Sequence, residues 1–308
     1  MLSSPLMAQD YPTRAVRMIV SFPPGTTPDI VARVVAPKLQ KAFGQPFVVE
    51  NRAGAGGNIA ADVVAKSAAD GYTLLVSTNA AVATNKVLFQ KLPYDPEKDL
   101  ETISLLATAP QALVVHQSVP VNDLKGFLAH MKANPGRLSY GSTGSGSASH
   151  LTMEVLKSRE GVFIVHIPYR GFPQAVGDAL SGNVQAMFAI IPAVLPHIKA
   201  EKMKALAVTG LKRSSLLPDV PSVQELGMPQ LESLAWIGLL APGNTSPEIV
   251  SRLAAAARAG LAEDDAKTLL SRAGFDIVGS TPTEFRAWQK AEIAKWGAVI
   301  RATGATPD

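Results

Sequence analysis

Glycines and hydroxyl-bearing residues concentrate in two short turns, and these turns are the segments best suited to bind a small ligand. They comprise residues 21–29 (SFPPGTTPD) and residues 141–150 (GSTGSGSASH), and neither contains Lys or Arg. Each turn follows a short apolar segment typical of a strand, residues 16–20 and residues 138–140, and precedes helical spacing. A helix N-terminus presents unpaired N–H groups and a partial positive charge. Two such turns facing one cleft therefore predict an anion site made of backbone and hydroxyl donors.

The two turns supply most of the side chains that we expect to bind the ligand. Hydroxyls after the apolar strand over residues 73–76 would add donors, because ligands of open α/β sheets bind at the carboxyl ends of strands. The predicted residues of the first wall are Phe22, Pro24, Gly25, Thr26, Thr27, Asp29, Ser77 and Thr78. Those of the opposite wall are Ser142, Thr143, Gly144, Ser145, Ser147, His150 and Tyr169.

Two of these residues have an equally simple structural interpretation. Asp29 stands at the start of a helical segment, where a carboxylate stabilises the helix dipole by about 0.3–1 kcal/mol without touching any ligand. His150 stands in the first turn of the next helical segment, where local hydrogen bonding is the simpler role. Both therefore remain open between ligand binding and support of the turn.

A serine-dependent α/β hydrolase is the rival interpretation of the second turn, with Ser145 or Ser147 as nucleophile and His150 as base. The turn contains no G-x-S-x-G motif in any register, and no acid can be assigned to orient the histidine. The glycine run over residues 54–57 has Ile59 where a dinucleotide fingerprint needs its third glycine, and no phosphate-binding loop motif occurs. The histidines show no H-x-x-x-H spacing. We therefore expect no catalytic residue, no metal and no cofactor.

Composition restricts the function further. The chain has 308 residues, 47% hydrophobic and 18% charged, a net charge of +4 and no cysteine, so disulfides and thiolate sites are excluded. Its Lys and Arg residues are scattered, which argues against nucleic-acid binding. No apolar run approaches the roughly 18 residues of a membrane span. Residues 1–10 are expected to be either the remnant of a signal peptide or a disordered start.

Strand and helix signals alternate along the chain, which predicts an α/β fold with two mostly parallel sheets covered by helices. The length exceeds what one core usually organises, so two domains are expected. Lobe I is predicted to comprise residues 11–106 plus 234–308, and lobe II residues 107–233. The hinge is expected near residues 107–110 and 234–236.

Local signals predict individual elements near the hinge and at the C-terminus. The apolar residues 103–109 and 112–115 indicate two strands separated by Pro110. Thr281 followed by Pro282 and by Glu284 is a capping box and predicts the start of the last helix.

The order and spacing of several short motifs resemble the Bug family of periplasmic solute receptors, the substrate-binding components of tripartite tricarboxylate transporters. The resemblance runs from about Tyr11 to the C-terminus. The motifs that carry it are Tyr11-Pro12, Pro23-Pro24-Gly25, Val49-Glu50-Asn51-Arg52, Gly54-Ala55-Gly56-Gly57-Asn58, Asp70-Gly71-Tyr72-Thr73-Leu74, Gly141-Ser142-Thr143-Gly144, Ser149-His150-Leu151, Ile167-Pro168-Tyr169-Arg170-Gly171, Leu217-Pro218-Asp219-Val220-Pro221-Ser222, Trp236-Ile237-Gly238-Leu239 and Ala241-Pro242-Gly243.

This resemblance implies a two-lobed Venus-flytrap receptor in the periplasm. It implies that the receptor captures a small organic carboxylate between its lobes and delivers it to the permease subunits of a membrane transporter. We also expect the receptor to be a monomer. A receptor that only senses its ligand, without transport, is the alternative within this class.

The chain departs from the family pattern at three positions. Thr26 replaces the second glycine of the first turn, Pro28 replaces a threonine, and Ala189 stands where an aspartate often follows a strand. Ala189 is therefore added to the predicted ligand-binding residues. Because the missing carboxylate was a partner for a ligand ammonium, we expect an acid without an amine to be preferred over an amino acid.

Overall fold

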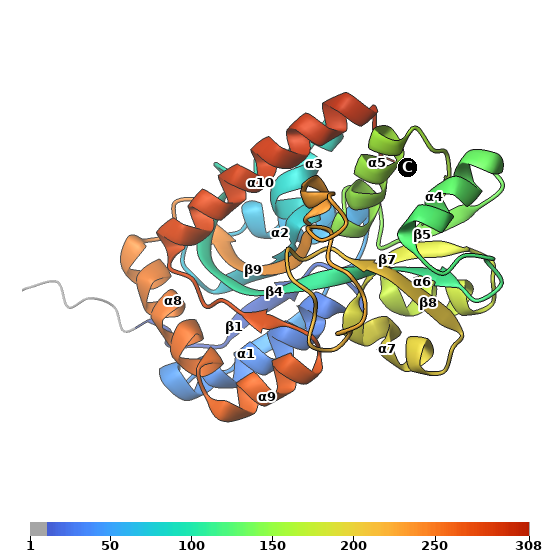
Figure 1. The fold of residues 1–308 in the computed structure, drawn as a ribbon. Coiled ribbons are helices and arrows are strands. Elements are labelled where there is room, and N and C mark those ends of the chain that lie inside the picture. Colours follow the sequence, from blue (N-terminus) through green and yellow to red (C-terminus); the bar gives the residue numbers. More distant parts are fainter. Residues whose placement is uncertain (1–10, 308) are drawn as a thin grey trace, which may run out of the picture.

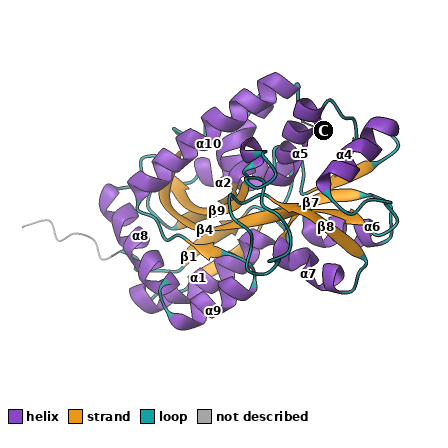
Figure 2. Ribbon diagram, viewed as in Figure 1, coloured by secondary structure: helices purple, strands orange, loops and turns teal. Residues whose placement is uncertain are grey.

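The computed structural model describes residues 11–307 as a mixed α/β protein built on one continuous sheet. Figures 1 and 2 show the strands running through the middle of the molecule with helices on both sides. The strand order is β2 (Phe47–Asn51), β1 (Val16–Val20), β3 (Thr73–Thr78), β9 (Leu234–Pro242), β4 (Leu100–His116), β7 (Ala186–Ile190), β5 (Ser139–Ser142) and β6 (Val165–Pro168), and β8 (Met203–Val208) and β10 (Asp276–Ile277) also pair with β4. The prediction for residues 1–10 lies outside the described residues.

The helices alternate with these strands as the sequence pattern predicts, which confirms an α/β fold. They are α1 (Thr27–Phe43), α2 (Asn58–Ala65), α3 (Asn85–Leu88), α4 (Leu124–Ala133), α5 (Ala148–Glu160), α6 (Phe172–Leu180), α7 (Ile191–Lys199), α8 (Pro247–Leu261), α9 (Asp264–Arg272) and α10 (Pro282–Thr303). The short turns η1 (Ala55–Gly57), η2 (Ala80–Thr84) and η3 (Pro229–Leu231) join them.

Strand direction changes between the ends and the middle of the sheet. At one end β1 is parallel to β2 and β3, and at the other end β5 is parallel to β6 and β7, as expected for βα units. In the middle, β9 is antiparallel to β3 and β4, and β4 is antiparallel to β7 and β8. The sheet is therefore parallel within each βα series and antiparallel where the chain crosses between the two series.

Strand β4 is the main segment by which the chain crosses from one βα series to the other. Residues 100–110 pair with β9, and residues 111–115 pair with β7. The sequence predicts two strands here, interrupted at Pro110, but the structure has one continuous strand. The strand continues through Pro110 because this residue lies at the point where β4 changes its pairing partner from β9 to β7. A proline there costs little, since it removes one ladder hydrogen bond where the pairing changes anyway.

The names lobe I and lobe II are kept below for the predicted residue sets, whose boundaries stay a prediction. In lobe I, α1 and α8 pack on one face of the sheet around Val16, Leu39 and Leu253, and a second core around Trp236 and Phe285 lies on the other face. In lobe II, two further cores cover the two faces of β7.

Helix α10 links the two lobes. It begins at the predicted capping box, in which Thr281 Oγ1 accepts from the Glu284 N–H and the Glu284 carboxylate accepts from the Thr281 N–H. The helix then runs across the molecule toward α5 (Figure 1), and Trp296 and Ile300 join the lobe II core that contains Leu151. The predicted domain division assigns this helix to lobe I, and its last turns contact lobe II.

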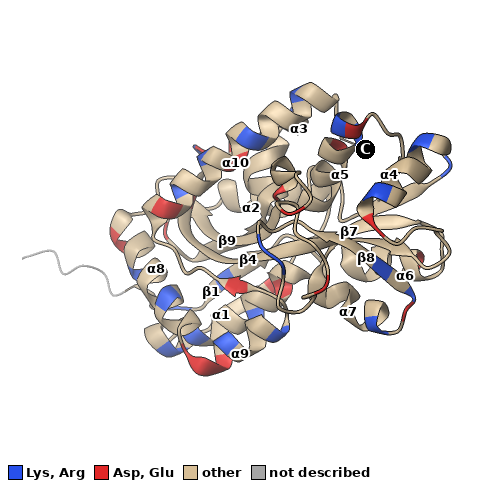
Figure 3. Cartoon of the chain, in the orientation of Figure 1, with Lys and Arg blue, Asp and Glu red and all other residues tan. Residues whose placement is uncertain are grey.

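Most charged residues lie on the outside of this framework, whereas Asp29, Glu154 and Glu292 are buried. Figure 3 shows Lys, Arg, Asp and Glu on the outer helices and loops, whereas β7 and β9 carry none. Among the described helices, none combines the length and the apolar character needed to cross a membrane.

Candidate functional site

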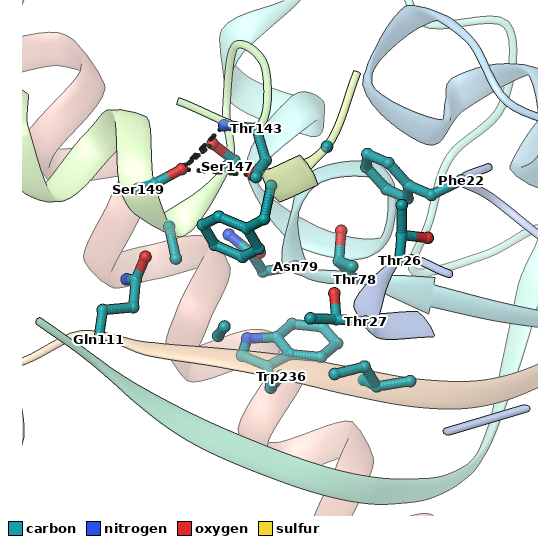
Figure 4. A pocket seen from close by; sticks show the side chains of 15 residues that line it. Phe22, Thr26, Thr27, Thr78, Asn79, Gln111, Thr143, Ser147, Ser149 and Trp236 are labelled. Carbon is teal, nitrogen blue, oxygen red and sulfur yellow. Dashed lines mark hydrogen bonds between the residues drawn. The ribbon is translucent and has the colours of Figure 1, made fainter. Parts of the chain in front are cut away.

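A small cavity of about 30 Å³ lies between the two predicted turns, at the carboxyl end of β3 and beside the crossing strands (Figure 4). None of the described residues that line it is charged. They are Phe22, Thr26, Thr27, Thr78, Asn79, Gln111, Thr143, Ser147, Ala148, Ser149, Gly171, Phe172, Ala235, Trp236 and Ile237. The helices α1 and α5 both begin at this cavity, so their N-terminal partial charges favour an anion there.

The first turn is fixed by hydrogen bonds that point away from the cavity. Thr26 Oγ1 donates to the Pro23 carbonyl at 2.6 Å, and the Gly25 N–H donates to Asp29 Oδ2 at 2.9 Å. Asp29 also accepts from Arg33 Nε at 3.0 Å and from Asn51 Nδ2 at 2.9 Å, and its side chain is 3% exposed. Asp29 thus holds the turn in shape and does not line the cavity.

Replacement of Asp29 tests this anchoring role. Burial raises the pKa of Asp29, but hydrogen bonds from Arg33, the Gly25 N–H and Asn51 outweigh burial and hold the pKa below its usual value. We expect Asp29→Ala to lower the free energy of unfolding by about 1–3 kcal/mol at neutral pH, because the Gly25 N–H and the Asn51 amide lose their acceptor. Urea denaturation over a pH series measures this, with exposed Asp219→Ala as control.

The sign of the pH dependence follows from the lowered pKa. A carboxylate with a depressed folded pKa contributes stability that is present above its unfolded pKa, about 3.9. That contribution disappears as the pH falls through the lower folded value. The difference between wild type and Asp29→Ala should therefore narrow in acid, and an undiminished difference there would contradict the role of the ionised carboxylate.

The second turn forms a compact network of hydroxyls. Ser147 caps α5, with its Oγ accepting from the His150 N–H at 3.3 Å, and lies 3.0 Å from Ser149 Oγ. Ser149 Oγ accepts from the Thr143 N–H at 3.1 Å and lies 3.3 Å from Thr143 Oγ1. Figure 4 shows Thr143, Ser147 and Ser149 grouped on one side of the cavity. This network presents prepositioned hydroxyls to a ligand at the start of a helix.

Aromatic and acidic residues support this turn from behind. His150 Nδ1 accepts from the Gly146 N–H at 3.1 Å, and its ring stacks on His166 with centroids 4.2 Å apart. His166 Nε2 in turn lies 2.6 Å from Ser142 Oγ. Tyr140 donates its hydroxyl to Glu154 at 2.7 Å. In this structure His150 and Ser142 shape the turn and do not line the cavity.

The two lobes touch at the edge of the cavity. Thr84 Oγ1, in η2 of lobe I, donates to the Gly146 carbonyl of lobe II at 2.6 Å, and Asn79 Nδ2 donates to the same oxygen at 3.3 Å. The Gly146 Cα lies close to this surface, because an added Cβ would come within 2.4 Å of Asn85 Oδ1. The turn can therefore approach lobe I only with glycine at this position.

Six of the predicted ligand-binding residues line the cavity: Phe22, Thr26, Thr27, Thr78, Thr143 and Ser147. The predicted residues that do not are Pro24, Gly25, Asp29, Ser77, Ser142, Gly144, Ser145, His150, Tyr169 and Ala189. Ser77 Oγ donates to Ser21 Oγ, and Ala189 is buried in a lobe II core. Tyr169 donates to Asp178 at 2.6 Å, and burial together with that carboxylate raises the pKa of Tyr169 to about 12.

Sequence reasoning missed other lining residues. Ala148 and Ser149 belong to the predicted second turn, and Gly171 and Phe172 closely follow Tyr169. The sequence therefore indicated these segments, although these four residues were not predicted to bind the ligand. Asn79 follows the predicted hydroxyls of β3 directly. Gln111, Ala235, Trp236 and Ile237 come from the crossing strands, where apolar strand patterns gave no sign of a site.

A second and larger cavity, of about 500 Å³, adjoins the first. The two share Thr26, Thr27 and Phe172 as lining residues. Its other walls come from α1, α6 and α7 and are mostly apolar: Gly25, Ile30, Pro173, Val176, Gly177, Leu180, Ile190, Pro192, Ala193, His197 and Ala273. We call it the apolar groove.

Comparisons with known proteins find a matching family model and a similar curated protein. Residues 31–305 match the family model described as the tripartite tricarboxylate transporter family receptor. The protein BugT of Bordetella pertussis is 39% identical over 305 residues, covering 99% of this chain and 94% of that protein.

Two solved structures with bound ligands are also similar. The R. palustris protein Rpa4515 with adipate superimposes with a TM-score of 0.90 at 36% identity, covering 97% of this chain and 100% of that one. MatC from Rhodopseudomonas palustris with bound malate gives a TM-score of 0.87 at 32% identity, covering 94% of this chain and 100% of that one.

Proposed function

The chain belongs to the tripartite tricarboxylate transporter receptor family, and from this premise we propose that its interlobe cavity captures one small organic carboxylate and that the closed protein delivers it to a membrane permease. Membership of this family and the two-lobed fold make the protein a solute-binding receptor for small carboxylates, of the Bug type. We further propose that the ligand binds in this cavity, that the protein is a periplasmic monomer, and that its partners are the permease subunits.

The observation that carries the proposal is the uncharged cavity at which α1 and α5 both begin. Helix N-termini and the hydroxyls of Thr27, Thr78, Thr143 and Ser147 can hold a carboxylate without Lys or Arg. Neutral donors suit transport, because a receptor must release its ligand and a buried ion pair would slow that release. The relatives with adipate and malate bound support a dicarboxylate as the ligand.

A thermal-shift screen over mono-, di- and tricarboxylates tests the proposal. A ligand that binds only the folded protein stabilises it by about 2.7 kcal/mol at a hundredfold excess over its Kd, so a binding acid should raise the Tm by several degrees. Absence of a shift with every acid would overturn the proposal. Covalent labelling by a serine-directed phosphonate would instead favour the hydrolase alternative, which neither the family nor the fold supports.

A matched pair of variants tests whether the ligand binds in this cavity. Thr143→Val keeps the side-chain shape and removes one hydroxyl, which should weaken binding by about 0.5–1.5 kcal/mol, or more if a buried ligand oxygen is left unpaired. Thr283→Val is the control, because Thr283 is exposed on α10, far along the chain from either turn. Equal affinities in the two variants would remove Thr143 from the site.

A further inference from the structure

Gln111 has a buried side-chain amide that points into the cavity. Its side chain is fully buried, and neither Nε2 nor Oε1 has a hydrogen-bond partner among the described residues. Figure 4 shows this side chain reaching toward the side of the cavity where Ser149 lies. Its backbone, by contrast, is fully paired, since Gln111 N donates to Thr209 Oγ1 and Gln111 O accepts from Thr209 N. The unsatisfied groups are those that face the cavity.

A second buried glutamine, in contrast to Gln111, has a fully hydrogen-bonded side-chain amide. Gln289 on α10 is also fully buried, and it donates to the Val82 and Pro96 carbonyls and accepts from Arg286 Nη1. Leaving a buried polar group unpaired costs about 1–3 kcal/mol, and such groups are rare in native proteins. The contrast indicates that the Gln111 amide is kept for a partner that arrives with the ligand.

The amide requires a partner that both accepts and donates. Nε2 donates, so it can bind a ligand carboxylate oxygen, whereas Oε1 only accepts. An ionised carboxylate has no proton to give, so an unsubstituted acid would leave Oε1 unpaired. The ligand therefore needs a hydroxyl or an ammonium group close to its carboxylate.

The charge of the cavity decides between these two groups. None of its described lining residues is an Asp or Glu. The nearby Asp29 carboxylate is occupied by Arg33, Asn51 and the Gly25 N–H. A buried ammonium without a counter-charge is strongly disfavoured, whereas a neutral hydroxyl needs only the acceptor that Gln111 Oε1 supplies.

We infer that the receptor selects hydroxycarboxylates, with Gln111 Oε1 accepting from the ligand hydroxyl and Nε2 donating to the adjacent carboxylate. This inference rests on the proposed function and makes it more specific. It gives Gln111 the role of a specificity-determining residue on the crossing strand, where the ligand would also contact the segment that joins the lobes.

Matched pairs of acids test the inference by calorimetric titration. The pairs are lactate with propionate, malate with succinate, and citrate with tricarballylate, and aspartate is added as the amine analogue of malate. In the pair that binds, the hydroxylated acid should bind at least about tenfold more tightly than its deoxy partner. Gln111→Leu should abolish that ratio by weakening the hydroxylated acid, and the exposed Gln224→Leu should preserve it.

The outcomes separate the inference from the function on which it rests. If no acid of any pair binds, the proposed function fails. If the deoxy acid binds as tightly as its hydroxylated partner, or if aspartate binds more tightly than malate, the function stands and the inference is overturned. An unchanged ratio in Gln111→Leu would likewise remove Gln111 from the recognition of the hydroxyl.

The stability of Gln111→Leu gives a readout that a structural glutamine would not. Leucine has a similar volume and no polar atoms, so it removes the unpaired amide from the unliganded protein. We expect the Tm of unliganded Gln111→Leu to equal or exceed that of wild type while its binding of the hydroxylated acid is lost. A lower Tm would assign Gln111 a structural role and contradict the inference.

Discussion

Replacing Glu292 with alanine is expected to lower the free energy of unfolding by about 2–5 kcal/mol. The Glu292 side chain is buried on α10, and Oε2 accepts from two indole N–H groups, Trp236 Nε1 at 2.8 Å and Trp296 Nε1 at 2.9 Å. Trp236 belongs to a lobe I core and Trp296 to a lobe II core. Alanine would leave both indoles buried without an acceptor, so one substitution removes a hydrogen bond from each of two hydrophobic cores.

Two further variants identify the cause. Glu292→Gln keeps an amide oxygen as acceptor and should cost less than half as much as alanine. Glu248→Ala removes an exposed carboxylate on α8 and should have almost no effect. Urea denaturation measures all three. If Glu292→Gln were as damaging as Glu292→Ala, the loss would come from the negative charge, and not from the two indole hydrogen bonds.

The same substitution should also weaken ligand binding. Trp236 lines the cavity beside Thr27 in Figure 4. Its indole N–H donates to Glu292, and this hydrogen bond fixes the orientation of the ring. Loss of that hydrogen bond allows the indole to turn, which alters the cavity floor. We expect the Kd for the best-binding acid to rise in Glu292→Ala under conditions in which the variant is still folded.

Local signals made much of the fold predictable. The capping box at Thr281 starts α10 as predicted, and Ser147 caps α5 at the end of the second turn. Both turns lie between a strand and a helix, as the alternating pattern requires. These features depend on residues a few positions apart, and sequence spacing records them directly.

Long-range contacts explain what the sequence did not reveal. Gln111 and Trp236 lie on β4 and β9, whose apolar patterns predict only strands, and they reach the cavity because these strands pair in the middle of the sheet. Likewise, the sequence did not decide whether Asp29 binds the ligand or supports the turn. The fold places Asn51 beside Asp29, where its amide donates to the carboxylate. Side-chain direction across a sheet depends on register, which spacing in one segment does not supply.

Removing the Phe172 ring should change which ligand length the receptor prefers. Phe172 lines both the 30 Å³ cavity and the 500 Å³ apolar groove, so its side chain forms part of the wall between them. In Phe172→Ala the two spaces should join, and a longer dicarboxylate could place its middle carbons against Ile30 and Val176. Each buried methylene contributes about 0.8 kcal/mol, so adipate, with two more methylenes than succinate, should gain roughly tenfold relative to succinate.

Calorimetric titration of wild type and Phe172→Ala with succinate and adipate measures this ratio of affinities. Phe163→Ala is the matched control, because it removes an exposed ring of lobe II that lines neither cavity. Phe172→Leu should give an intermediate ratio, since leucine fills part of the space of the ring. Phe172 also packs against cores of both lobes, so a general loosening would weaken both acids together. A ratio equal to that of wild type would show that the groove is not continuous with the ligand site, because only a joined cavity rewards the longer chain.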